Sequence, residues 1–442
     1  MAPYAELQAY LQKVSSEYDL TPKITFQATV KRCEWIEDRN RWQLTIHDGK
    51  SDTIFHHECQ FLYSGTGILV EPREPDIPGV DTFKGRLVHP SRWRDDISVK
   101  DKDVVVVGNG CTATQIVPAI ADDAKSVTQY IRSKHWIIPP VLPREFEGIL
   151  PPVRFLFRWV PGFMGFIRLV IFLGAENDWR GFLMTKDGER YRKSKERWAT
   201  RYTKKHAPEK YHDMLIPDFP FGCKRRIHDP GYLDALHKDN IDVLEDPILE
   251  VVPEGVRTKD GIKKADVIVM ANGYSTNTFM PNIEVVGKYG KTLTQHWDEF
   301  GGPEAYNSVL VNGFPNFFML LGPNTATGHT STILAIENAV NYSLRIIKPI
   351  LDKRSLTVDV KREAEQRDVD EIQAALQKTV WHMDCKSWYA RDANGNYGRN
   401  SSTYPYTQPR YWWKCLFPKW NDLRYTVSLP DMHQPTTFVR LF

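Results

Sequence analysis

The stretch Asp103-Val-Val-Val-Val-Gly-Asn-Gly-Cys-Thr-Ala-Thr-Gln115 decides the fold of this chain. Residues 104–107 are β-branched throughout, which predicts a strand buried on both faces of a parallel sheet. A G-x-G-x-x-A pattern follows at residues 108–113, residues 112–121 predict a helix, and residues 126–131 predict a second strand. A chance match in a turn is the alternative, but the βαβ context favours a dinucleotide-binding loop.

Each small residue of such a loop has its own physical role. The first glycine makes the tight turn, the second lets the backbone approach a pyrophosphate, and the third small residue lets helix and strand pack closely. The phosphates would lie at the helix N-terminus, where backbone N–H groups are unpaired. We therefore predict that the following consecutive residues bind the cofactor: Gly108, Asn109, Gly110, Cys111, Thr112, Ala113, Thr114 and Gln115.

The end of the second strand indicates which dinucleotide binds. A site for NAD has an Asp or Glu at this place, which accepts hydrogen bonds from the ribose 2′-hydroxyl. This chain has Arg132, Ser133 and Lys134 instead. The two cations would hold a 2′-phosphate, and the serine would add a hydrogen-bond donor. A solvated basic strand end is the alternative, but the position relative to the glycines favours NADP.

Composition bounds the function further. The chain has 442 residues, 41% of them hydrophobic, which is enough for two or three domains with their own cores. Lys and Arg number 58 against 55 Asp and Glu, so we expect no nucleic-acid partner. The six cysteines lie far apart and show no spacing typical of a metal site, so we predict no metal and six free thiols in a reducing compartment.

No targeting or membrane-spanning segment is predicted. The N-terminal residues show no basic segment followed by an apolar one, so we expect no signal peptide and a cytoplasmic location. Residues 155–175 are the most apolar segment, but Arg158, Arg168 and Pro161 interrupt it short of the roughly 20 residues that a transmembrane helix needs. An interfacial or domain-covering helix is predicted, with at most weak membrane association.

The remaining segments predict an alternation of helices and strands. Helices are expected at residues 4–18, from 332 through 347 and at 362–380; strands are expected at 24–35, 42–46, 61–64, 241–244, 256–258, 266–270 and 317–321. A helical insertion is expected at about residues 140–220, with a solvated helix face at 186–205. Residues 381–420 are rich in aromatic side chains and are predicted to form a loop-like tail.

Several short motifs stand in a characteristic order. They are Gly65-Thr-Gly67, the linker pattern Phe83, Gly85, His89 and Trp93, the βαβ unit, Lys224-Arg225, Ala271-Asn-Gly273 and Gly322-Pro-Asn324 with Gly328-His329. In this order the chain resembles Baeyer–Villiger monooxygenases of the class B flavoprotein group, which are related to flavin-containing monooxygenases. It departs from the family at Arg94, where Pro or Asp is usual. It is most similar to fungal enzymes of secondary metabolism, of the aflatoxin and sterigmatocystin type.

The resemblance implies an α/β flavoprotein with two dinucleotide-binding domains. Residues 1–82 and 256–442 would form an incomplete FAD-binding domain, and residues 83–255 an inserted Rossmann-like NADP-binding domain that carries the helical insertion. The implied reaction uses FAD and NADPH to insert one oxygen atom from O2 into a ketone, which gives an ester or a lactone. The implied setting is fungal polyketide or mycotoxin biosynthesis, and the oligomeric state is left open.

The resemblance also assigns roles to single residues. Arg225 takes the position of the catalytic arginine, beside Lys224; a surface cluster of cations is the alternative. Asn324 and His329 would lie behind the flavin ring, although His329 could instead cap a helix. Trp388 would contact NADP, with burial in an aromatic tail as its alternative. His89 would couple cofactor movement to the active site, or play only a structural part.

One part of the family pattern is missing from the sequence. Family members carry a second G-x-G-x-x-G loop, for the FAD pyrophosphate, whereas residues 1–100 contain only Gly49, Gly65, Gly67, Gly79 and Gly85. The prolines that follow Gly67 exclude a helix there. Two hypotheses follow: a monooxygenase whose activity needs a further N-terminal part, or an NADP-binding homologue or accessory protein without flavin chemistry.

Overall fold

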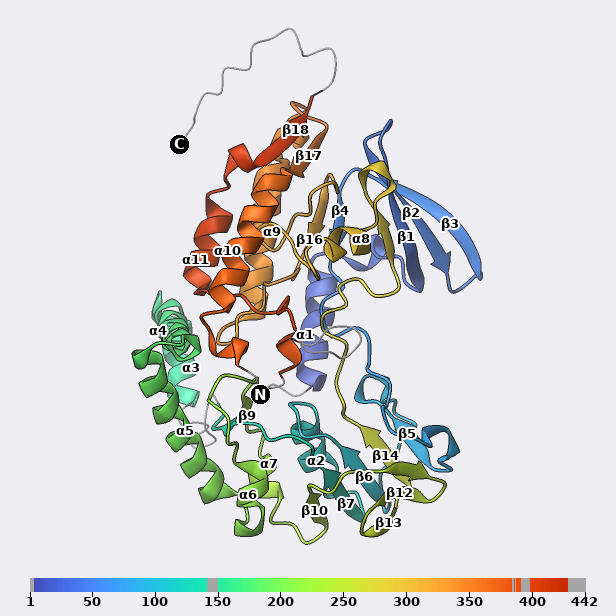
Figure 1. Cartoon of the computed structure of the whole chain (residues 1–442), viewed down its shortest axis with the longest axis vertical. Coiled ribbons are helices and arrows are strands. Elements are labelled where there is room, and N and C mark those ends of the chain that lie inside the picture. The colour runs from blue at the N-terminus through green and yellow to red at the C-terminus, as the bar shows by residue number, and fades with distance from the viewer. Residues whose placement is uncertain (1–3, 141–149, 384, 386, 391–397, 428–442) are drawn as a thin grey trace. The chain divides into compact units, whose positions relative to one another are not determined.

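The computed structural model describes residues 4–140, 150–383, 385, 387–390 and 398–427. The chain forms two compact units, each with its own hydrophobic core (Figure 1). Unit 1 comprises residues 1–68, 277–377 and 392–442, and unit 2 comprises residues 69–276 and 378–391. Unit 2 thus continues beyond residue 255, where the sequence predicted a domain boundary, because the strand at residues 267–270 pairs within its sheet.

Unit 2 is built on a five-stranded parallel sheet with the strand order β10-β7-β6-β14-β5. Its strands are β5 (Arg86–Val88), β6 (Asp103–Val107), β7 (Ser126–Tyr130), β10 (Ile241–Leu244) and β14 (Val267–Met270). The predicted β6 and β7 are confirmed, and so is the helix between them, α2 (Ala113–Ile120). The order places the two strands of the βαβ unit side by side in the sheet.

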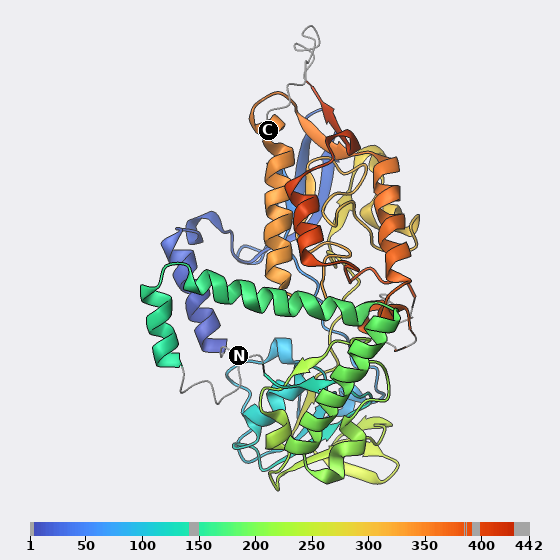
Figure 2. The same ribbon diagram turned by 90° about the vertical axis from the view of Figure 1, so that its left-hand side faces the viewer.

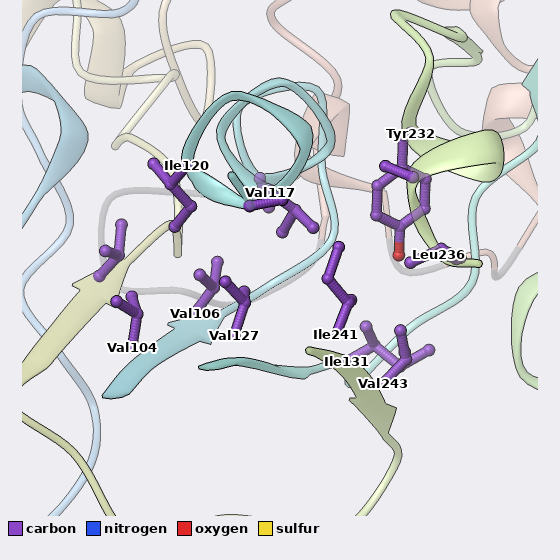
Figure 3. Packing of buried hydrophobic residues seen from close by; sticks show 14 of the residues in the cluster. Val104, Val106, Val117, Ile120, Val127, Ile131, Tyr232, Leu236, Ile241 and Val243 are labelled. Carbon is purple, nitrogen blue, oxygen red and sulfur yellow. The ribbon is translucent and has the colours of Figure 1, made fainter. Parts of the chain in front are cut away.

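The core of unit 2 lies between α2 and this sheet. Val117 and Ile120 on α2 point toward Val104, Val106 and Val127 on the strands (Figure 3). Val106, Val117 and Val127 are fully buried. Burying side chains of this size contributes about 1.5–3 kcal/mol each, which fixes the helix on the sheet. The start of α2 is thereby held at the end of β6.

A helical insertion and smaller strands complete unit 2. The insertion contains α3 (Leu150–Trp159), α4 (Phe163–Asn177), α5 (Lys186–His206) and α6 (His212–Leu215), and residues 141–149 of the predicted insertion lie outside the described residues. The remaining elements are α7 (Tyr232–Ala235), β8 (Ile137–Ile138), β9 (Ile227–His228), β11 (Glu250–Val252), β12 (Gly255–Thr258) and β13 (Gly261–Lys264). In the described part of the chain, no helix combines the length and apolar character needed to cross a membrane.

A late segment of the chain, residues 378–391, packs into unit 2. Cys385 forms a disulfide with Cys223, with their Cα atoms 6.1 Å apart, and the Trp381 indole donates to the Gly222 carbonyl. The prediction of six free thiols is therefore wrong for this pair. The partners are 162 residues apart, so local spacing carries no sign of the bond. The other four cysteines are free thiols: Cys33, Cys59, Cys111 and Cys415.

Unit 1 contains a four-stranded sheet in the order β15-β1-β2-β3 and two strand pairs, β4–β16 and β17–β18. The strands are β1 (Ala28–Ile36), β2 (Arg41–Asp48), β3 (Thr53–Cys59), β4 (Leu62–Ser64), β15 (Glu284–Val286), β16 (Phe317–Met319), β17 (Thr357–Val360) and β18 (Leu423–Thr426). Its helices are α1 (Tyr4–Glu17), α8 (Leu293–Asp298), α9 (Thr332–Leu351), α10 (Arg362–Leu376) and α11 (Gln408–Leu416).

Helix α11 corrects the prediction of a loop-like tail. The Thr407 side chain accepts from the Arg410 N–H and begins the helix, and Tyr411 and Cys415, one turn apart, are buried where α11 packs against α9. Trp412 and Trp413 stay exposed. Aromatic residues on both faces hid the helical period from the sequence. Residues 391–397 of the same tail lie outside the described residues.

Candidate active site

The glycine loop leaves the end of β6 and is shaped by its two glycines. Gly108 has φ +113°, and a Cβ there would lie 2.6 Å from the Ala271 carbonyl oxygen, so only glycine fits. Its N–H donates to the Tyr130 carbonyl over 2.8 Å. A Cβ on Gly110 would meet no atom within 4 Å, so open space lies above this part of the loop.

The loop also presents hydrogen-bond donors. Thr114 and Gln115 donate from their side chains to the carbonyls of Gly110 and Cys111, which stabilises the loop from the α2 side. From Asn109 to Ala113, no backbone N–H donates to a protein acceptor within the described residues. Unpaired N–H groups at the start of a helix bind anions, so the loop fits the pyrophosphate of a dinucleotide.

Gln129 supports this loop and was not predicted from the sequence. The fully buried side chain donates to the Gly108 carbonyl over 2.8 Å and accepts from the Tyr232 hydroxyl over 2.7 Å. Both polar ends of the amide are thereby satisfied, as a buried amide requires. A long amide side chain in the second strand of the βαβ unit was the signal that could have identified it.

The predicted phosphate-binding residues follow β7 at the same edge of the sheet, because β6 and β7 are adjacent and parallel. Arg132 is exposed, while Ser133 and Lys134 are half-buried. Neither cation has a hydrogen-bond or ion-pair partner among the described residues. Two cations without carboxylate partners beside a glycine loop fit a 2′-phosphate, which would supply the missing acceptors.

The three consecutive cations after Cys223 have separate surroundings. Arg226 forms an ion pair with Asp178, with Nη2 2.6 Å from Oδ2, and only 11% of its side chain is exposed. The Lys224 ammonium lies 4.6 Å from the centre of the Phe219 ring. Arg225 alone reaches the glycine loop, where its guanidinium hydrogen-bonds to Cys111 and to Tyr389. These separate contacts do not match a uniform surface cluster.

Tyr389 is the second residue that the sequence did not reveal. Its ring is buried, with its centre 4.3 Å from that of Trp388 and 6.1 Å from that of Trp381. Burial raises the pKa of Tyr389, so it remains a neutral phenol whose oxygen accepts from the Arg225 guanidinium. Burial lowers the pKa of Arg225, but Tyr389 and Cys111 outweigh it and raise the pKa overall. Arg225 therefore carries a fixed positive charge.

His135 links the end of β7 to the backbone of Arg225. Burial, reinforced by the Lys224 charge, lowers the pKa of His135 to about 4, although its hydrogen bond to the Arg225 backbone opposes the shift. The imidazole is consequently neutral near pH 7. It holds the backbone that carries Arg225 without adding a competing charge.

The four linker residues surround β5. His89 is buried, and its nitrogens contact the Ser91 hydroxyl over 2.8 Å and the Gly273 carbonyl over 3.1 Å, which are structural contacts. A Cβ on Gly85 would lie 2.4 Å from the Asp266 carbonyl oxygen, and Phe83 and Trp93 pack against separate hydrophobic clusters of unit 2. His89 and Trp93 also line a cavity of about 700 Å³.

Asn324 and His329 belong to unit 1. Asn324 is buried with φ +53°, and its amide donates over 2.9 Å to the carbonyls of Asn400 and Thr403. Among the described residues its buried Oδ1 has no partner, which leaves an acceptor for a bound polar group. His329 is buried, and the helix α9 that follows is capped by Ser331, which accepts from the Leu334 N–H. The alternative of a capping role for His329 is therefore wrong.

Comparison with known proteins identifies the family. Residues 2–148 match the model of the flavin-binding monooxygenase-like family. The FAD-binding monooxygenase ktnD of Aspergillus niger is 30% identical over 94% of this chain and 69% of that protein. A Baeyer–Villiger monooxygenase of Streptomyces coelicolor is 32% identical over 92% of this chain and 75% of its own length. This chain belongs to the flavin-binding monooxygenase-like family.

Solved structures agree with this membership at the level of the fold. A crystal structure of OTEMO in complex with FAD and NADP matches with a TM-score of 0.80 and 24% identity, over 96% of this chain and 85% of that one. A closed structure of cyclohexanone monooxygenase matches with a TM-score of 0.77 and 20% identity, over 96% and 85% of the two chains. The resemblance and the α/β fold predicted from the ordered motifs are thus confirmed.

Proposed function

We propose that this family member is an FAD- and NADPH-dependent monooxygenase that inserts one oxygen atom from O2 into a ketone, giving an ester or a lactone. The observation that carries the proposal is the anchoring of Arg225 to Cys111 of the glycine loop and to Tyr389. This arrangement would put a permanent cation beside the predicted hydride donor. Relatives named FAD-binding monooxygenase in Aspergillus niger and Aspergillus terreus support the flavin-dependent reaction, and its setting would be fungal secondary metabolism.

NADPH would be held entirely by unit 2. The N–H groups of the glycine loop would bind its pyrophosphate, and Arg132 with Lys134 would bind its 2′-phosphate. Trp388, half-buried against Tyr389, would contact the cofactor close to Arg225. The cofactor, when bound, supplies a hydride; the residues supply position and selectivity.

Arg225 would stabilise the negative charge that develops on the ketone oxygen when the carbonyl carbon is attacked. A guanidinium stays charged throughout and donates in a planar fork, which suits an oxyanion. Tyr389 and Cys111 restrict its orientation before the reaction, so little reorganisation is needed at the moment of attack. Such preorganised donors are worth about 2.7–4 kcal/mol of activation free energy each.

FAD would supply the activation of O2, and unit 1 offers part of its site. The buried Oδ1 of Asn324, which has no partner in the part of the chain that the structure describes, and the buried His329 would fit a polar ring edge. The sequence places no second G-x-G-x-x-G loop in residues 1–100. For that reason a second candidate is retained, an NADP-binding homologue or accessory protein without flavin chemistry.

The substrate would be a small carbonyl compound, O2 the co-substrate and the cytoplasm the location. Any membrane contact would be peripheral, without a crossing. The near balance of 58 cationic and 55 anionic residues supports the absence of a nucleic-acid partner.

The proposal is tested by supplying ¹⁸O2, NADPH and FAD with a panel of ketones and analysing products by mass spectrometry. We expect one ¹⁸O atom in each ester or lactone. Arg225→Ala should lower the rate by about 10²–10³-fold while changing NADP⁺ affinity by less than about threefold. The matched variant Arg226→Ala should lower stability instead, because it removes one of the two ion pairs of the partly buried Asp178, which keeps only Lys195.

Two results would contradict the assignment. Unchanged ester formation by Arg225→Ala would remove the catalytic role of this arginine. NADP⁺ binding without any flavin absorbance retained after desalting would favour the second candidate, the homologue without flavin chemistry. The two results are distinguishable, because the first concerns one residue and the second the whole reaction.

A further inference from the structure

The helix pair α3–α4 exposes an unusually apolar surface. The two helices are joined at Pro161 and Gly162, and the Phe157 and Phe163 rings contact each other with centres 5.7 Å apart. Large apolar side chains on both helices are more than half exposed: Phe155 61%, Trp159 63%, Phe166 59%, Leu169 52%, Ile171 53% and Leu173 57%. Contiguous exposed apolar surface of this kind marks an interaction site.

The distribution of these residues around α4 argues for a particular kind of partner. Leu169, Val170 and Ile171 are consecutive, so they point about 100° apart around the helix, and all three are exposed. No residue of α4 is buried. A docked protein would cover one stripe of the helix and leave the opposite face in water. A helix that is apolar on all sides suits an apolar medium.

The length of α4 decides whether the helix could cross a lipid bilayer or only enter one side of it. Its 15 residues extend about 22 Å, which is less than the roughly 30 Å of a bilayer's hydrocarbon core. Together with the turn into α3, this length fits insertion into one leaflet rather than a crossing. Figure 2 shows α4 continuing at one end into α5 and turning at the other into α3.

The exposed charged side chains on and beside these helices are mostly cationic, which favours a partner surface that is anionic. The exposed charged side chains described on α3 and α4 are Arg158 and Arg168, and the Arg158 guanidinium lies 5.6 Å from the centre of the Trp159 ring. Tryptophan and arginine together are typical of the headgroup region, where the ring is half immersed and the cation meets phosphate. Exposed cations continue along α5 at Arg190, Arg197, Arg201, Lys204 and Lys205.

We propose that the α3–α4 pair is an interfacial anchor, which inserts its apolar side chains into one leaflet of an anionic phospholipid surface. Arg158 and Arg168 would lie among the headgroups, and the cations of α5 would add long-range attraction. The anchor is independent of the proposed reaction. It acts whether or not NADPH or a ketone is bound.

The test is flotation of the purified chain with vesicles of phosphatidylcholine alone or with about a third phosphatidylserine. We expect at least about tenfold more protein on the anionic vesicles at low salt. The double variant Leu169→Glu/Ile171→Glu should lose at least about tenfold of this binding. The control Leu249→Glu changes a side chain of unit 2 with a similar exposure, 54%, and should bind like the wild type.

Circular dichroism and NADP⁺ titration of each variant check that unit 2 is still folded. Size-exclusion chromatography of the same variants measures self-association. Vesicle binding that the α4 double variant retains would overturn the proposal, as would the absence of any binding by the wild type. Self-association that the same variant removes, without vesicle binding, would instead assign the surface to a second copy of the chain. Equal binding to neutral and anionic vesicles would overturn the role given to the arginines.

Discussion

The glycine loop of unit 2 and the β4–β16 pair of unit 1 differ in the number of parallel strands that pair in their sheets, five in unit 2 and two in unit 1. Gly108 is held between neighbouring parallel strands and by Gln129. Strand β4, by contrast, pairs with β16 in a two-stranded parallel sheet, and α1 of the same unit buries none of its residues. Parallel strands are stable chiefly when both faces and both neighbours are covered. We therefore expect the two units to differ in how rigidly they hold a cofactor site.

The two units should differ in how much conformational entropy a cofactor site loses when the cofactor binds. In unit 2 hydrogen bonds from Gln129 to Gly108, and from Arg225 to Cys111 and the buried Tyr389, hold the loop before any cofactor binds, so less conformational entropy remains to be lost. In unit 1 the buried Oδ1 of Asn324 lacks a partner within the described residues. A ligand or further chain that supplied one would stabilise unit 1 more than unit 2.

The largest expected effect is the difference between two glycine variants of the loop, one of which should lose stability and the other NADP⁺ affinity. Gly108→Ala forces a Cβ to within 2.6 Å of the Ala271 carbonyl at a positive φ, and we expect it to lower the free energy of unfolding by about 4 kcal/mol. Gly110→Ala meets open space and should change stability by less than about 0.5 kcal/mol, yet weaken NADP⁺ binding at least tenfold. Urea denaturation and calorimetric titration measure the two quantities. Equal loss of stability in both variants would contradict the assigned cofactor position.

A smaller effect appears in the pH dependence of stability, with opposite signs in the two units. His135 of unit 2 has its pKa lowered by burial from 6.5 to about 4, so the unfolded chain takes up the proton first. We expect this site to lose about 3 kcal/mol as the pH falls from 7 to 4. Asp359 of unit 1 has its pKa raised by burial from 3.8 to about 7, so its contribution is present at low pH and lost as the pH rises toward 7.

The variants His135→Gln and Asp359→Asn check these signs by denaturation at a series of pH values. The first should flatten the loss of stability on the acid side, and the second should flatten the loss between about pH 4 and pH 7. Parallel curves for wild type and His135→Gln would show that this imidazole is not buried in the neutral form. The two units would then not differ in the sign of their pH dependence as expected.

The smallest effect concerns apolar side chains of the two units. Val117→Ala removes a fully buried side chain between α2 and the sheet of unit 2, and should cost about 2 kcal/mol. Leu11→Ala in α1 of unit 1 removes a side chain that is 64% exposed, and should cost less than about 0.5 kcal/mol. Thermal unfolding of both variants tests the difference. A large loss at Leu11 would show that α1 is covered in solution.

Local patterns predicted much of unit 2, because strand, loop, helix and strand follow one another within residues 103–131 and their signals are short-range. The spacing of Gly108, Gly110 and Ala113 was enough to place the loop at the end of β6. Tyr389 and the Cys223–Cys385 disulfide could not be predicted, since they depend on a segment that returns to unit 2 after about a hundred residues in unit 1. The separate contacts of Lys224, Arg225 and Arg226 depend on the same long-range packing.

The central claim is that unit 2 carries an organised site for NADP(H), and Arg132 offers its most direct test. Calorimetric titration of the wild type and of Arg132→Ala with NADP⁺ and with NAD⁺ gives four affinities. We expect the wild type to prefer NADP⁺ by at least about tenfold, and Arg132→Ala to lose most of that preference while binding NAD⁺ almost unchanged. Equal affinity of the wild type for the two cofactors, or an equal loss of both in the variant, would contradict the account.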